Sequence, residues 1–75
     1  MTLDEFIEAF AEEFFSTDPS EFKAGTEFKT LDEWSSLVAL SIIAMVDENM
    51  GKTITGADIR ASKTIEDLYN KALTK

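Results

Sequence analysis

The sequence contains neither cysteine nor histidine. Without cysteine it can form no disulfide, no thiolate zinc site and no thiol nucleophile. Without histidine it lacks the side chain that most often serves as a general base and as a neutral metal ligand. Its three glycines are scattered, so no phosphate-binding glycine loop is present. We therefore expect a chain that has no catalytic residues and no metal site of its own.

Positive charge is also scarce, because aspartate and glutamate outnumber lysine and arginine by 15 to 7 and the net charge is −8. Such a surface repels nucleic acid and anionic lipid, and it attracts basic partners. The same acidity can equally serve solubility alone. We expect no nucleic-acid partner.

The 75 residues are enough for a single domain that spans residues 1–75. A domain of this size buries only about 60% of its unfolded-chain surface, so it cannot enclose a large catalytic cleft as well as a core. The N-terminal segment lacks the basic start and apolar run of a signal peptide, and no apolar stretch approaches the ~20 residues that cross a membrane. We expect a cytoplasmic monomer without a membrane span.

Apolar side chains recur at three-to-four-residue spacing in four segments, which predicts helices over residues 3–15, 36–49, 57–61 and 65–73. A threonine followed three residues later by an acid, the capping-box pattern, occurs four times. These pairs are Thr2/Glu5, Thr30/Glu33, Thr55/Asp58 and Thr64/Asp67. The sequence thus predicts an all-α fold, a four-helix bundle with three longer helices and a short third one.

The connection over residues 16–35 is unusually long for a compact domain, and loops of about this length are often functional. It carries four large apolar residues, which we expect to hold it against the bundle: Phe22, Phe28, Leu31 and Trp34. A short extra helical turn is expected near residues 31–34. Gly51 is expected to end the second long helix as a left-handed cap.

The second long helix is apolar nearly all round at its N-terminal end. One side carries Ala39, Ile43, Val46 and Met50 and is flanked by Leu40 and Ile42. The opposite side carries Leu37, Ser41, Ala44 and Glu48, with Val38 and Met45 beside it. The second set can be an exposed surface that binds a partner. A central helix that is simply more buried explains the same pattern, so both interpretations stay open.

The segment Leu31-Asp32-Glu33-Trp34-Ser35-Ser36-Leu37 places two serines at the start of this helix, directly after the long connection. A serine in that position is usually an N-cap, whose side chain accepts a hydrogen bond from a free backbone N–H. On its own, therefore, the segment predicts that Ser35 or Ser36 caps the helix.

The same segment resembles the modification site of the acyl carrier protein family, which usually reads Asp-Ser-Leu and is sometimes preceded by Trp. Ser36-Leu37 matches the Ser-Leu pair and Trp34 matches the Trp. The order and spacing of the helices match over nearly the whole chain, and four further residues fall at similar places relative to the serine: Phe28, Ile54, Thr64 and Ile65. The chain departs from the family at Ser35, which replaces the acid that helps the modifying enzyme to engage. It also departs on the second helix, where relatives often carry acids in place of Val38 and Ser41.

The resemblance implies that a phosphopantetheinyl transferase attaches 4'-phosphopantetheine to Ser36, and that the arm carries acyl groups as thioesters. The cargo would serve fatty acid or specialised biosynthesis, including polyketide, aminoacyl and D-alanyl pathways. It also implies docking of acyl-transferring enzymes with basic and apolar patches on Leu37, Val38, Ser41, Met45 and Glu48. An acyl chain could enter the bundle between walls formed by Ile43, Val46, Ile54, Ile59 and Leu68, although each of these is equally expected as ordinary core.

A second function of a different class fits the same residues. In this alternative the chain is an unmodified helical adaptor. Ser35 and Ser36 are then only helix caps, and the apolar face of the second long helix binds a partner protein. A free-standing enzyme is disfavoured, because the usual bases and nucleophile pairs are absent.

Overall fold

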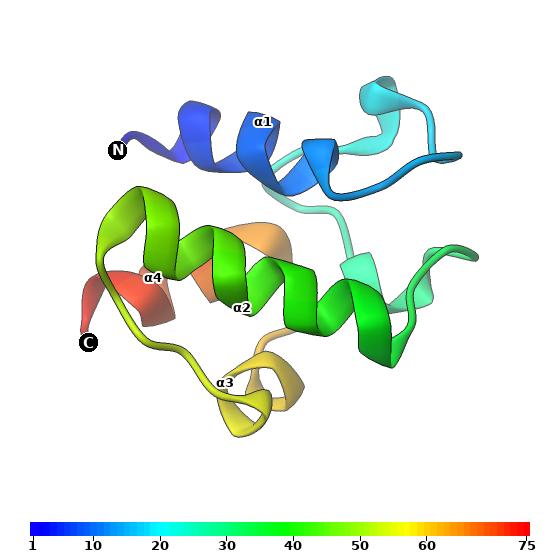
Figure 1. Cartoon of the computed structure of the whole chain (residues 1–75). Coiled ribbons are helices and arrows are strands. Elements are labelled where there is room, and N and C mark those ends of the chain that lie inside the picture. Colours follow the sequence, from blue (N-terminus) through cyan, green and yellow to red (C-terminus); the bar gives the residue numbers. More distant parts are fainter.

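A computed structural model describes residues 1–75 and contains four α-helices, two short 3-10 turns and no strand (Figure 1). The elements are α1 (Leu3–Glu12), η1 (Pro19–Glu21), η2 (Phe28–Thr30), α2 (Ser36–Met50), α3 (Gly56–Ala61) and α4 (Ile65–Leu73). In Figure 1, α2 crosses the front of the molecule, with α1 above it, α4 behind it and the short α3 below. The predicted small all-helical bundle is confirmed. None of these helices combines the length and the apolar character that crossing a membrane requires.

Three of the four predicted capping boxes are present, at Thr2, Thr55 and Thr64. Each threonine hydroxyl accepts from the N–H three residues ahead, and the acid at that position accepts from the threonine N–H. The first N–H groups of a helix have no partner within it, so these boxes fix where α1, α3 and α4 begin. The backbone N–H groups of Thr2 and Thr64 also lower the pKa of Glu5 and Asp67.

The fourth predicted box, Thr30 with Glu33, is wrong. Thr30 ends η2, and its hydroxyl donates backward to the carbonyl of Glu27 at 2.7 Å, so it caps no helix that follows. The N-cap of α2 is Ser35, whose Oγ accepts from the Val38 N–H at 3.3 Å. The extra helical turn that we expected near residues 31–34 lies earlier, at η2.

Two helix ends differ from the prediction. α1 stops at Glu12 instead of residue 15, because the N–H groups of Glu13 and Phe14 bond to carbonyls only three residues back and tighten the last turn. α2 continues to Met50, and Gly51 follows with a φ of 65°, which confirms the left-handed cap.

The core is a single cluster of fourteen buried apolar residues, and phenylalanines from α1 and the long connection form one side of it. The ring of Phe10 lies at the centre of this group, with its centroid 5.3–6.2 Å from four other rings. Those four are Phe6, Phe14, Phe22 and Phe28. Phe22 and Phe28 are buried, and Leu31 and Trp34 pack half-buried against the core. The four expected anchors of the connection are therefore confirmed.

The long connection also completes the hydrogen bonding of α4. The N–H groups of Ile65 and Glu66 donate to the carbonyls of Thr26 and Ala24, at 3.1 and 3.0 Å. These N–H groups lie in the first turn of α4, where no partner exists within the helix. The connection is thus attached to the bundle by backbone bonds as well as by buried rings.

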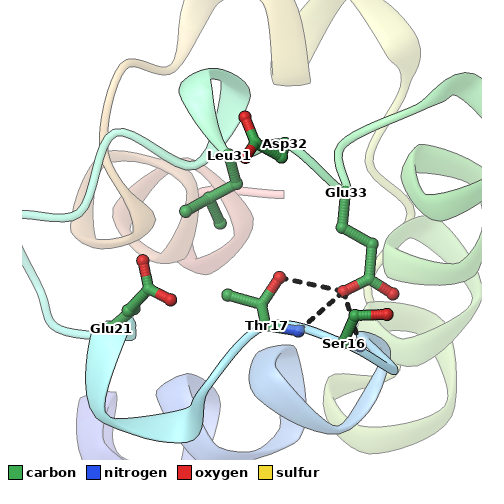
Figure 2. A pocket seen from close by; sticks show the side chains of 6 residues that line it. All are labelled: Ser16, Thr17, Glu21, Leu31, Asp32 and Glu33. Atoms are coloured by element: carbon green, nitrogen blue, oxygen red, sulfur yellow. Dashed lines mark hydrogen bonds between the residues drawn. The ribbon is translucent and has the colours of Figure 1, made fainter.

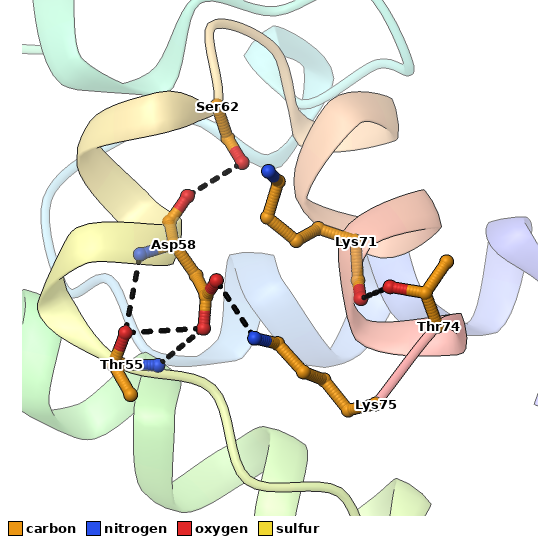
Figure 3. A network of polar contacts seen from close by, with 6 residues as sticks. All are labelled: Thr55, Asp58, Ser62, Lys71, Thr74 and Lys75. Atoms are coloured by element: carbon orange, nitrogen blue, oxygen red, sulfur yellow. Dashed lines mark hydrogen bonds and ion pairs between the residues drawn. The ribbon is translucent and has the colours of Figure 1, made fainter.

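A polar network joins the C-terminal residue to α3 (Figure 3). Lys75 Nζ lies 2.9 Å from Asp58 Oδ1, and the same carboxylate accepts from the N–H and hydroxyl of Thr55. The bond from Lys75, followed by the N–H of Thr55, lowers the pKa of Asp58. Ser62 donates to the Asp58 carbonyl at 2.8 Å, which satisfies the only buried polar side chain.

We expect Phe10→Ala to lower the free energy of unfolding by about 3–5 kcal/mol, because it removes a buried ring and leaves a cavity among its neighbours. Phe15→Ala is the matched control, since Phe15 is 94% exposed and the same truncation there should change stability by less than about 0.5 kcal/mol. Urea unfolding followed by circular dichroism measures both. Equal losses in the two variants would contradict the core described above.

Candidate functional site

Ser36 is the first residue of α2 and is exposed to solvent. Its neighbour Ser35 is the N-cap of α2, so the structure decides which of the two serines caps the helix. The Ser36 hydroxyl makes no hydrogen bond within the chain, and the N–H groups of Ser36 and Leu37 likewise have no partner there. The site therefore combines a free hydroxyl with two free backbone donors at the positive end of a fifteen-residue helix.

The loop in front of Ser36 is held by the carboxylate of Glu33 (Figure 2). Oε2 accepts from the N–H of Phe15 at 2.6 Å, and Oε1 accepts from the N–H groups of Ser16 and Thr17 at 2.9 and 3.0 Å. The Thr17 hydroxyl donates to Oε1 as well, at 2.9 Å. One side chain thus joins the end of α1 to the segment that leads into α2. We call this arrangement the Glu33 clamp.

The Glu33 clamp favours the ionised carboxylate. The N–H of Phe15 contributes most, and the bonds from Ser16 and Thr17 add to it, so that the pKa of Glu33 lies below its ordinary value of 4.5. Glu21 and Asp32 line the same hollow (Figure 2), but no three acidic side chains converge in the geometry of a metal site.

Ser36 also lies on the edge of a surface groove of about 620 Å³ between α2, α3 and η2. Trp34 and Ser35 continue the edge, and apolar side chains that include Ile43 and Ile59 form part of its wall. The groove brings together only these two of the five residues expected to line an acyl cavity. The other three, Val46, Ile54 and Leu68, do not line it and are buried in the core.

The expected docking face on α2 is wrong in two positions. Val38 and Met45 are only 8% and 3% exposed, because they share the buried stripe of α2 with Ile42 and Val46. The sequence placed this stripe on a neighbouring side of the helix, since a helix that is apolar nearly all round has no unique inner face. Of the remaining members, Leu37 and Glu48 are exposed and Ser41 is half-buried.

Two exposed apolar residues near this surface were not found from the sequence. Leu40 is 63% exposed, although the periodicity placed it beside the buried side of the helix. Phe15 was assigned to the first helix, but the Glu33 clamp holds its backbone beyond the end of α1 and its ring is exposed.

Comparison of the chain with protein-family models, with curated proteins and with solved structures gave no match. The interpretation of the site therefore rests on its own residues and geometry.

We expect Glu33→Gln to destabilise the fold at neutral pH, because an amide offers one acceptor oxygen to four donors. The folded-state pKa of Glu33 is depressed, so its contribution is present above pH 4.5 and is lost as the pH falls through the lowered pKa. The stability difference between wild type and variant should therefore narrow below pH 4.5.

Urea unfolding at a series of pH values measures this difference. Glu8→Gln is the control, since Glu8 is exposed and its side chain makes no hydrogen bond. A difference between the wild type and the Glu33→Gln variant that stays constant across the acidic range would contradict the Glu33 clamp.

Proposed function

We propose that this chain is a non-catalytic carrier of the acyl carrier protein type, and that Ser36 is the attachment point of a 4'-phosphopantetheine arm that carries acyl groups as thioesters. One observation carries the proposal. Ser36 presents a free, exposed hydroxyl at the first position of α2, while Ser35 performs the capping that would otherwise occupy it. A serine whose only role is to cap the helix would be expected at the N-cap position, which Ser35 occupies.

The surroundings of Ser36 suit the product of such a modification. A phosphodiester on this hydroxyl carries one negative charge, and the free N–H groups of Ser36 and Leu37 and the dipole of α2 favour an anion there. The fold further supports the proposal through its long anchored connection and its short α3, which are the features that the resemblance implied.

The chemistry would be divided between this chain and its partners. In the transferase, the Ser36 Oγ forms a bond to phosphorus of coenzyme A, the bond from that phosphorus to the nucleotide breaks, and the nucleotide leaves with the electron pair. The proton of the hydroxyl goes to a base of the transferase, because this chain has no histidine and no carboxylate bonded to Ser36. The arm supplies the thiol that the polypeptide lacks.

The exposed apolar residues near this end of the bundle support docking by partner enzymes. Leu37 and Leu40 are 74% and 63% exposed on α2, and Phe15 is exposed beyond the end of α1. The net charge of −8 favours partners whose docking patches combine apolar pockets with basic residues. We therefore propose contacts through Leu37, Leu40, Ser41 and Glu48, in place of the buried Val38 and Met45.

Intact mass spectrometry after incubation with coenzyme A and a broad-specificity phosphopantetheinyl transferase tests the proposal. The wild type should gain the mass of one arm, and Ser36→Ala should gain none. Ser35→Ala is the matched control: it should still be modified, although loss of the cap should lower stability by about 1 kcal/mol. A mass gain that persists without the Ser36 hydroxyl would overturn the assignment.

Ser35→Asp should be modified faster than the wild type. Aspartate caps a helix about as well as serine, so α2 should begin at the same residue. The substitution also restores the acid that the resemblance associates with engagement of the transferase. Initial rates of mass gain at a fixed transferase concentration measure the effect, and a slower rate with unchanged stability would contradict this role for residue 35.

The unmodified adaptor stays a second candidate because of the exposed Leu37, Leu40 and Phe15. It predicts that no transferase modifies the chain. It also predicts that polar substitutions at these three positions abolish partner binding while Ser36→Ala has no effect.

A further inference from the structure

The groove beside Ser36 contains two of the seven basic residues of this acidic chain, Lys29 and Arg60. Neither forms an ion pair, since the only salt bridge in the structure joins Lys75 to Asp58. Fifteen acidic residues are available, yet both cations at this groove are without a carboxylate partner. Their charges are therefore free to bind an anion.

A hydrogen bond positions Lys29 at the groove, and the Arg60 guanidinium lies close to Gly56. Lys29 Nζ donates to the carbonyl of Arg60 at 3.0 Å, which joins η2 to α3 and leaves two of the three ammonium protons free. A Cβ at residue 56 would lie 3.3 Å from Arg60 Nη1, so Gly56 provides the space in which the guanidinium lies against α3.

Five of the ten residues that line the groove are apolar, and Ser35, Ser36 and Gly56 complete the lining. Its aliphatic side chains are those of Ala39, Leu40, Ile43 and Ile59, and Trp34 contributes the only tryptophan of the chain. An apolar wall with a few positive groups fits a ligand that combines an anion with an uncharged chain.

We propose that this groove binds the root of the arm on Ser36, with Lys29 and Arg60 paired to the phosphodiester and the aliphatic wall covering the adjoining pantetheine chain. This inference rests on the proposed function. Because the arm is tethered at the edge of the groove, its phosphodiester is present there at high effective concentration. Exposed ion pairs are individually weak, so the arm exchanges between groove and solvent and partner enzymes can withdraw it.

The unmodified chain tests the groove without the arm. Trp34 is half-buried on the groove, so its fluorescence reports access of the anionic quencher iodide and of the neutral quencher acrylamide. The double variant Lys29→Gln/Arg60→Gln should lower the iodide quenching constant roughly twofold at low salt, as expected for removal of two screened charges, and leave acrylamide quenching unchanged. The variant Lys23→Gln/Lys63→Gln makes the same charge change outside the groove and should retain wild-type quenching. Equal iodide constants in the wild type and the groove variant overturn the inference.

The modified chain tests the arm itself, after mass spectrometry shows that it is attached. Loading should lower iodide quenching of the wild type to the level of the groove variant, because the phosphodiester now occupies the two cations. Loading of the groove variant should leave its iodide quenching unchanged. A loaded wild type that iodide quenches as strongly as the unmodified chain overturns the inference while the proposed function stands. A chain that no transferase modifies overturns both, and the mass distinguishes the two failures.

Discussion

Phe22 and Phe28 are buried in the core although they belong to the connection between α1 and α2, and α2 can begin only where that connection ends. Their rings pack on Phe10, and the backbone of the same segment supplies carbonyls to the first turn of α4. Burial of a large aromatic ring contributes far more than any exposed hydrogen bond. The course of the connection is therefore set by the core, and the Glu33 clamp then fixes its last residues against the end of α1. The position of Ser36 follows from these two constraints.

The parts of the fold that could be predicted are those with a local cause. Three capping boxes, the left-handed Gly51 and the apolar anchors of the connection each depend on a few neighbouring residues, and the sequence contains them. The Glu33 clamp could not be found in this way, because its partners lie 16 to 18 residues away along the chain. The spacing in the sequence also allows Glu33 to form a local capping box with Thr30. In the structure its carboxylate bonds instead to the distant N–H groups of Phe15, Ser16 and Thr17.

The buried face of α2 could not be predicted from the sequence, for a different reason. Periodicity identifies an inner side only when the other side is polar, and α2 carries apolar residues on several sides. The buried stripe contains Val38 and Met45, while Leu37 and Leu40 are exposed. The pairing of Lys29 with the end of α3 was equally hidden, since the two residues are 31 positions apart. For the site, then, the serine could be located from sequence, whereas the groove and the exposed surface around it required the packed structure.

Both chain ends lie on the left of Figure 1, whereas α2 begins on the right. The hydroxyl of Tyr69 donates to the Met1 carbonyl at 2.7 Å, and Lys52 donates to the Lys75 carbonyl, so both ends are held to the bundle. Fusion to another polypeptide at either terminus would consequently leave the start of α2 unobstructed. The same geometry suits immobilisation through a terminal tag, in which Ser36 faces away from the support.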